Sequence, residues 1–208
     1  SSNRTVIAVA SRTPFGKYRG GISSVRPDDL LSLTFQDLLG KVPNLDPATI
    51  DEVIAGNSNG AGEDNRNVAR MSALLAKIPV TVPAVSVNRL CGSGAEAIAQ
   101  AARLINSGEA EVVIAGGVES MSRAPWVLPK SDTPLDPKLS LQQTTVGWRM
   151  INPQMPPEWT KSLGESAESV GEQYGISRGA QDEWSVRSHQ LADAAWSKGV
   201  NDYVFEVN

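Results

Sequence analysis

The sequence predicts an α/β fold in which helices cover both faces of a largely parallel β-sheet. Short apolar, β-branched stretches alternate along the chain with segments of helical periodicity, and the connections between them are short. The strand-like stretches are nearly continuous apolar runs, which are typical of strands buried on both faces. With 208 residues, 40% of them hydrophobic and 20% charged, the chain is long enough to bury a sizeable core.

The chain begins with two strand–helix alternations. "RTVIAVA" predicts a buried strand at 4–10, and the proline and glycines that follow it predict a loop at 11–21. A helix is expected at 26–40, because a proline and two aspartates suit its first turn and a glycine suits its end. "DEVIAG" predicts a strand at 51–56, and 67–78 has helical periodicity that stops at a proline.

The alternation continues with a strand at 83–88 ("PAVSVN"), a helix at 91–107 and a strand at 110–117 ("AEVVIAGG"). Gly108 suits the C-terminal cap of that helix. The resulting order is β-α-β-α-β-α-β, and crossover helices of this kind join parallel neighbours in one sheet.

The character of the sequence changes after Ser120. Residues 123–160 are rich in proline and tryptophan and show little periodicity, which is typical of a long ordered loop with a function. Two helices are expected at about 165–174 and 178–198, and "DYVFEV" at 202–207 predicts a strand that returns to the first part. The expected inner stripe of the last helix consists of Ala180, Trp184, Arg187, Ser188, Leu191 and Ala195.

Cys91, the single cysteine, lies where a predicted strand ends and a predicted helix begins, in "VNRLCGSGAEAI". The first-turn N–H groups and the helix dipole at such a point favour a thiolate. Gly92 and Gly94 leave room for a substrate carbonyl, and the free N–H groups would stabilise a developing oxyanion. A stripe at helical spacing is expected to point the sulfur inward: Cys91, Ala95, Ile98, Ala102 and Ile105.

A purely structural role for Cys91 stays open, because a free cysteine most often serves as a small buried hydrophobe. A cysteine nucleophile usually needs a base. The single histidine, His189, lies about 140° around its predicted helix from Trp184, at 100° per residue. That position is expected to face solvent, so no Cys–His dyad is expected within this chain.

Composition excludes several classes of function. A net charge of −4 argues against nucleic acid or an anionic membrane as the main partner. The sequence has no apolar run long enough to span a membrane and no secretory signal at its start. One cysteine excludes an internal disulfide framework and fits a cytoplasmic location, and no His/Cys cluster suggests a metal site. Neither a P-loop nor a G-x-G-x-x-G dinucleotide fingerprint is present.

Four segments, in order along 4–207, resemble those of the thiolases, the acyl-CoA C-acetyltransferases. "VNRLCGSGAEAI" is similar to the segment around the active-site cysteine. "SRTPFGKYRGG" resembles the N-terminal RTP-x-G-x-x-x-G segment, and "AGGVESMSRAP" resembles the GG-x-ESMS segment. The stretch from "SLGESAES" to "AAWSKG" resembles the end of the family's inserted loop domain. The "ESMSRAP" and "ISRGAQDEWSVRSHQ" segments argue against a related ketoacyl or hydroxymethylglutaryl synthase.

The resemblance implies a layered αβαβα fold built from two similar halves, with a loop domain inserted into the first half over the coenzyme A pocket. Residues 4–119 correspond to the first half, 120–200 to the loop domain and 201–208 to a strand that returns to the first half. By the same resemblance, Cys91 takes the acyl group in a ping-pong Claisen condensation or its thiolytic reverse, and its N–H contributes to an oxyanion hole. An acyl-CoA or coenzyme A is implied as substrate, with no tightly bound cofactor, and a homodimer or homotetramer is implied as the assembly.

Two departures from the family pattern matter. The G-H-P, N-E-A-F and C-x-G-G segments of the second half, which supply the activating histidine and a second cysteine, do not occur in these 208 residues. We therefore expect the N-terminal half of a thiolase, inactive alone and completed by a missing C-terminal half. The alternative is a non-catalytic acyl-CoA-binding half or a partner subunit.

The second departure is Ser162-Leu163, which stands where some short-chain members carry His-Met facing the bound pantetheine. The resemblance therefore implies that Leu163 binds substrate. "TTVGWRMINPQM" and "SLGESAES" are more similar to degradative bacterial members, including those acting on 3-oxoadipyl-CoA, than to biosynthetic ones.

Overall fold

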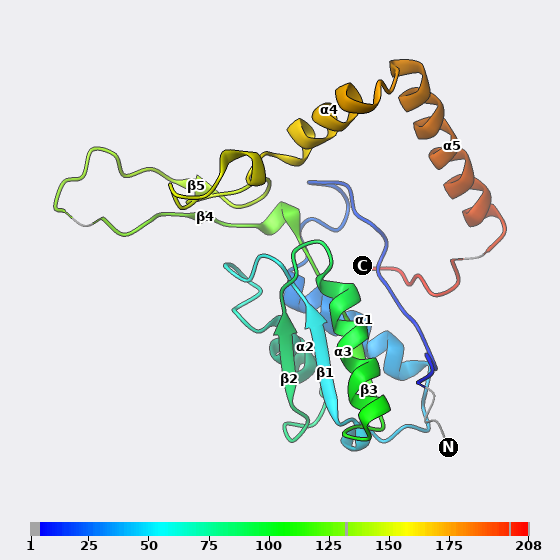
Figure 1. Cartoon of the computed structure of the whole chain (residues 1–208). Helices are drawn as coiled ribbons and strands as arrows, with labels where there is room; N and C mark the ends of the chain where they lie inside the picture. The colour runs from blue at the N-terminus through cyan, green and yellow to red at the C-terminus, as the bar shows by residue number, and fades with distance from the viewer. Residues whose placement is uncertain (1–4, 132, 200, 208) are drawn as a thin grey trace. The chain divides into compact units, whose positions relative to one another are not determined.

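The computed structural model describes residues 5–131, 133–199 and 201–207. The chain forms two compact units (Figure 1). The first holds the described residues up to Pro125 together with those from Tyr203 onward, and the second is Trp126–Asp202. The assignment of 4–119 and 120–200 to a thiolase half and a loop domain stays a prediction.

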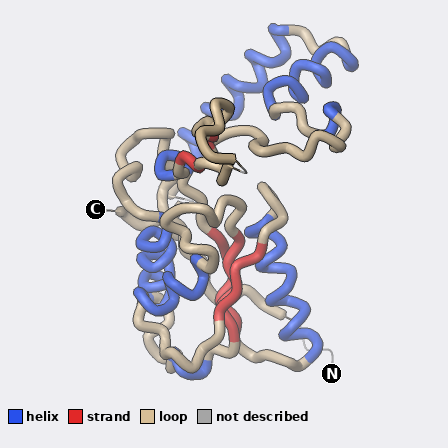
Figure 2. The backbone as a smooth tube through the Cα atoms, turned by 90° about the vertical axis from the view of Figure 1, so that its left-hand side faces the viewer, coloured by secondary structure: helices blue, strands red, loops and turns tan. Residues whose placement is uncertain are grey.

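A three-stranded parallel sheet forms the centre of the first unit (Figure 2). Strand β1 (Glu52–Gly56) lies between β2 (Ala84–Val87) and β3 (Val113–Gly117). In the register of the sheet, Ile54 of β1 is opposite Val85 and Ala115. The predicted parallel α/β architecture is confirmed, with these three strands in their expected places.

Helices cover the two faces of this sheet (Figure 2). Helices α1 (Pro27–Gly40) and α2 (Val68–Leu75) pack on one face, and α3 (Ser93–Ser107) packs on the other. Successive side chains of β1 alternate between these two cores, so Val53 packs with α1 and α2 while Ile54 packs with α3. Both are almost completely buried, and burying one such side chain stabilises the fold by about 1.5–3 kcal/mol.

The helix ends follow their caps. Helix α2 begins after Asn67, whose side chain accepts a hydrogen bond from the Arg70 N–H, and it ends at Leu75, before the expected residue 78. Lys77, two residues later, has a φ of 63° in the left-handed region, and its N–H donates to the Leu74 carbonyl at 3.0 Å. Helix α3 ends at Ser107 and is capped by Gly108, whose φ of 78° is the left-handed conformation that glycine adopts without strain.

The strand predicted at 4–10 does not form over residues 5–10, and residue 4 lies outside the described residues. Residues 5–11 contain no strand, and the Val6 and Ile7 side chains are 72% and 80% exposed. The next residue, Arg12, forms an isolated bridge with Val204. The returning strand predicted at 201–208 is therefore reduced to this bridge over residues 201–207, and residue 208 lies outside the described residues. A run of β-branched residues favours an extended backbone. A strand forms, however, only where a neighbouring segment accepts and donates the backbone hydrogen bonds.

The second unit holds two short strands and two longer helices. Strands β4 (Trp126–Val127) and β5 (Gln142–Gln143) pair antiparallel. Helix α4 (Leu163–Tyr174) begins in a capping box, in which Ser162 and Glu165 satisfy each other's backbone N–H groups. Single 3₁₀ turns occur in the chain at Pro47–Thr49, Met121–Arg123 and Pro157–Trp159.

Helix α5 (Arg178–Ser197) starts at the predicted N-cap, Ser177, which accepts from the Ala180 N–H. The predicted inner stripe is wrong, because none of the residues of α5 is buried and Trp184 is 70% exposed. The spacing of apolar residues shows which face of a helix could be buried. It does not show whether another element packs against that face. Within the described residues, no helix is both long and apolar enough to cross a membrane.

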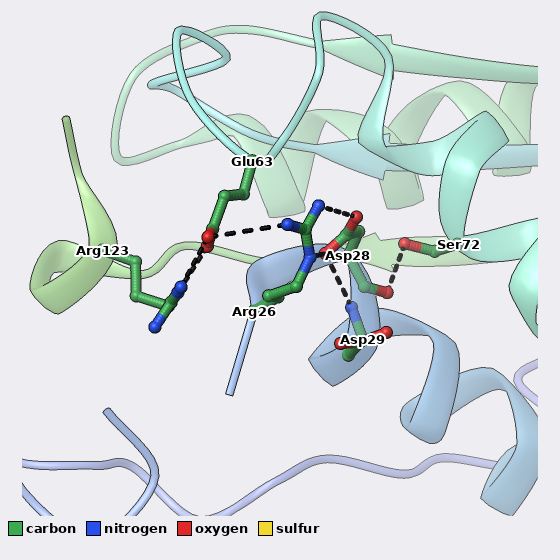
Figure 3. Close-up of polar contacts among 6 residues, drawn as sticks. All are labelled: Arg26, Asp28, Asp29, Glu63, Ser72 and Arg123. Carbon is green, nitrogen blue, oxygen red and sulfur yellow. Dashed lines mark hydrogen bonds and ion pairs between the residues drawn. The ribbon is translucent and has the colours of Figure 1, made fainter. Parts of the chain in front are cut away.

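A cluster of charged side chains ties three segments of the first unit together (Figure 3). The Arg123 guanidinium donates two hydrogen bonds to the Glu63 carboxylate, and these bonds lower the pKa of Glu63. Arg26 lies 3.6 Å from the same carboxylate and pairs with Asp28 at 2.7 Å, at the start of α1. This cluster, which we call the Glu63 clamp, joins the start of α1 to the segment that leads to Pro125, where the chain leaves the first unit.

Candidate active site

Cys91 lies between β2 and α3, just before Gly92, the N-cap of α3. Its side chain is exposed, so the expectation that the sulfur points inward is wrong. The reason is the phase of the helix. Helix α3 packs on the sheet through Ala97 and Ala101, and Ile98 of the predicted stripe is 49% exposed. Because the helix starts at residue 93 rather than 91, Cys91 belongs to the turn that precedes it.

Glycine brings the start of α3 against the ends of the strands. A Cβ built on Gly56, the last residue of β1, would lie 2.3 Å from the Ser93 carbonyl carbon. A Cβ on Gly117, the last residue of β3, would lie 2.7 Å from the Gly56 oxygen. Both spacings are too short for any side chain. The first turn of α3, directly after Cys91, therefore sits at the carboxyl edge of the sheet, where α/β proteins place ligands.

The turn that carries Cys91 is held by its own hydrogen bonds. Leu90 has φ of 50°, a left-handed conformation that is uncommon for a residue other than glycine. Its N–H donates to Asn88 Oδ1 at 2.9 Å, and its carbonyl accepts from Ser93 Oγ at 2.6 Å. Ser93 Oγ also accepts from the Arg89 N–H at 2.8 Å. We call residues 88–93 the Cys91 turn.

Two of the N–H groups expected to be free for an oxyanion are used within this turn. The Gly92 N–H donates to the Arg89 carbonyl at 3.1 Å, and the Ser93 N–H donates to the Leu90 carbonyl at 3.0 Å. The role of the Cys91 N–H in an oxyanion hole stays a prediction. The backbone beside the sulfur is thus held by hydrogen bonds within the turn itself.

Sequence reasoning missed the polar side chains around this turn. Asn57 is buried, and its Nδ2 donates to Asp64 Oδ1 and to the Val118 carbonyl, both at 3.0 Å. Burial raises the pKa of Asp64, since the charged form loses water there. Ser58 and Glu119 meet beside this pair. The available signal was position, because Asn57 and Ser58 follow directly after β1, Glu119 follows β3 by two residues, and the carboxyl ends of parallel strands share one edge.

A cavity of about 560 Å³ opens on the α1 side of the first unit. It is lined by Leu30, Phe35, Gly117 and Met121, among others, and Cys91 is not part of its lining. The exposed sulfur and this apolar cavity are therefore separate features of the first unit.

The other predicted site residue belongs to the second unit. Leu163 is the first residue of α4, and its side chain is 80% exposed. His189 is exposed on α5, as expected, but its exposure does not test the predicted phase, because none of the residues of α5 is buried. A substrate-binding role for Leu163 stays a prediction. Within the parts of the chain that the structure describes, no three His, Cys, Asp or Glu side chains gather where they could hold a metal ion.

Comparison with known proteins gives concordant results. The family model described as "Thiolase, N-terminal domain" matches residues 5–207. The β-ketoadipyl-CoA thiolase of Acinetobacter baylyi is 51% identical over 194 residues, which are 93% of this chain and 48% of that protein. The 3-oxoadipyl-CoA/3-oxo-5,6-dehydrosuberyl-CoA thiolase of Escherichia coli is 49% identical over 190 residues, which are 91% of this chain and 47% of that protein.

Among solved structures, the crystal structure of the Bacillus anthracis acetyl-CoA acetyltransferase is similar, with a TM-score of 0.84 and 34% sequence identity. The match covers 99% of this chain and 51% of that one. The chain therefore spans about half the length of the relatives that it matches.

Proposed function

The chain belongs to the thiolase family, and on that premise we propose that it is the acyl-accepting half of an enzyme that makes or cleaves a 3-ketoacyl-CoA. Cys91 is the proposed acyl acceptor. The observation that carries the proposal is the Cys91 turn, which presents an exposed sulfur at the strand–helix junction, within a family match that runs from residue 5 to 207.

The proposed first step is an acyl transfer. The Cys91 sulfur attacks the thioester carbonyl of an acyl-CoA, the carbonyl carbon–sulfur bond to coenzyme A breaks, and the coenzyme A thiolate leaves and takes up a proton. In the second step the carbanion of acetyl-CoA displaces Cys91 and forms the 3-ketoacyl-CoA; thiolysis is the reverse. A covalent intermediate divides one difficult carbon–carbon step into two easier ones. No tightly bound cofactor takes part in either step.

The groups that move protons in these steps are proposed to lie outside the 208 residues. The chain contains one cysteine and one histidine, and the histidine is exposed on α5. The length of the relatives, about twice that of this chain, supports a C-terminal half as the partner. The apolar side chains of Leu90 in the Cys91 turn and of Ile98 in α3, 53% and 49% exposed, are the surface that this partner is proposed to cover.

The proposed substrate is a 3-oxoadipyl-CoA-like thioester. Two relatives that match over more than nine tenths of this chain carry β-ketoadipyl-CoA or 3-oxoadipyl-CoA in their names, which supports this choice over acetoacetyl-CoA. Leu163 is proposed to contact the coenzyme A portion from the second unit. The proposed assembly is a homodimer or homotetramer in the cytoplasm.

Acylation of Cys91 tests the proposal. The protein as isolated is incubated with 3-oxoadipyl-CoA or acetyl-CoA and quenched in acid, and the peptide that contains Cys91 is examined by mass spectrometry. We expect a stoichiometric thioester on Cys91 that is absent in Cys91→Ser. An unmodified Cys91, or an equal adduct in Cys91→Ser, would refute the role. Acyl-CoA that binds without any acylation would favour the alternative, a non-catalytic binding half.

A further inference from the structure

We propose that Glu119 is a positioning residue for the Cys91 turn, acting through Ser58 and Asn88. This inference rests on the proposed function only in taking Cys91 as the acyl acceptor. Its physical content is a chain of hydrogen bonds, the Glu119 relay, that runs from Glu119 through Ser58 and Asn88 to the backbone of Leu90.

The relay begins with a carboxylate that binds a loop 61 residues away in the sequence. Glu119 Oε2 accepts from the Ser58 N–H at 2.8 Å and from Ser58 Oγ at 2.7 Å, and Oε1 accepts from the Asn59 N–H at 3.2 Å. Hydrogen bonds to an ionised acceptor are about twice as strong as those between neutral groups. Glu119 therefore fixes the position of the Ser58 peptide.

The second step links the residues after β1 to the residues after β2. Asn88 Nδ2 donates to the Ser58 carbonyl at 3.0 Å. The backbones of these two strand ends also meet directly, since the Asn57 N–H donates to the Val87 carbonyl at 3.0 Å. The relay therefore crosses the carboxyl edge of the sheet from β3 to β1 to β2, in the spatial order of the strands.

The third step reaches the residue before the nucleophile. Asn88 Oδ1 accepts from the Leu90 N–H at 2.9 Å, and Leu90 is the residue with the left-handed φ of 50°. Such a conformation in a bulky residue persists only where its surroundings hold it in place. One side-chain amide thus binds Ser58 with its nitrogen and the Cys91 turn with its oxygen, so a shift of Ser58 is passed to Leu90.

The relay lies at the surface. Its removal should therefore change the position of the Cys91 turn without preventing the first unit from folding. Glu119, Ser58 and Asn88 make these contacts in exposed surroundings, so water satisfies the donors when the carboxylate is removed. We therefore expect Glu119 variants to fold, with the Cys91 turn held less firmly. A reacting group displaced by about 1 Å loses on the order of a hundredfold in rate.

The test compares Glu119→Ala and Glu119→Gln with Glu111→Ala, a control in which another exposed carboxylate of the same unit is removed. Amide hydrogen exchange over residues 88–93 and the rate of Cys91 acylation are followed in the protein as isolated. Glu119→Ala should speed exchange over 88–93 and lower the acylation rate at saturating acyl-CoA about tenfold or more, with the half-saturating concentration little changed. Glu119→Gln should restore part of the rate, because its amide oxygen still accepts from Ser58.

Asn88→Ala supplies a second variant in the same relay. The double variant Glu119→Ala/Asn88→Ala should be no slower than the slower single variant, because coupled groups do not add. Exchange and acylation in Glu119→Ala that match Glu111→Ala, or losses that add in the double variant, would overturn the relay. If the unsubstituted protein is not acylated at all, the proposed function fails, and hydrogen exchange with iodoacetamide labelling of Cys91 still decides the relay.

Discussion

Gly56 has no side chain, and the close contact between β1 and the start of α3 depends on this. It ends β1 directly under the first turn of α3, and this contact could not be predicted, because a glycine at a strand end usually indicates a turn. The position of Cys91 at a strand–helix junction could be predicted from its neighbours in the sequence. The orientation of its sulfur could not, because it depends on the residue at which α3 begins.

Gly56→Ala should destabilise the first unit. The added methyl group would lie 2.3 Å from the Ser93 carbonyl carbon, so the start of α3 must shift away from β1. Overpacking of this kind costs about 1–3 kcal/mol, which urea-induced unfolding would measure as a lower midpoint. Gly116→Ala is the matched control, because a Cβ there meets nothing within 4 Å. Equal midpoints for the two variants would contradict the contact.

The elements that the sequence predicts best are those whose determinants are local. Helix α1 begins at its proline, α3 ends just before its cap Gly108, and β1 lies at its apolar run, one residue from the expected start. The stretches 5–11 and 202–207 have the same strand-like composition, but their pairing depends on residues far away in the sequence, which local composition does not reveal. The predicted inner stripe of α5 is wrong for a similar reason, because its burial depends on another element that packs against the helix.

The Glu63 clamp makes a prediction at the element scale, because it joins the start of α1 to the segment before Pro125 (Figure 3). The Arg123 hydrogen bonds lower the folded-state pKa of Glu63 below the ordinary value of 4.5. A depressed folded pKa contributes stability that is present above the unfolded value and is lost as the pH falls through the folded one. The protein should therefore lose stability on acidification from about pH 5 downward, and Glu63→Gln should lose less.

Urea midpoints at a series of pH values check this prediction. Glu111→Gln, in which a carboxylate outside the clamp is neutralised, should keep the acid dependence of the unsubstituted protein. If Glu63→Gln and Glu111→Gln show the same loss of stability in acid, the clamp does not hold its segment electrostatically.

At the scale of the whole molecule, the family could be predicted from four ordered segments of the sequence, and the family model over 5–207 agrees with it. The polar edge around Asn57, Ser58 and Glu119 could not be predicted in the same way. Ser58 and Glu119 are 61 residues apart and meet only because β1 and β3 are parallel neighbours. The proposed site therefore depends partly on the local segment around Cys91, which the sequence predicts, and partly on the order of the strands in the sheet, which it does not.

The 208-residue chain, as the proposed acyl-accepting half of a thiolase, should accept an acyl group without completing a catalytic cycle. The decisive measurement is turnover of 3-oxoadipyl-CoA and coenzyme A by the chain, alone and with the C-terminal half of a relative added in trans, alongside thioester formation on Cys91. We predict one acyl group per chain and no sustained thiolysis by the chain alone, with turnover appearing only when the second half is supplied and disappearing in Cys91→Ser. Sustained thiolysis by the chain alone, or turnover that survives Cys91→Ser, would contradict this assignment.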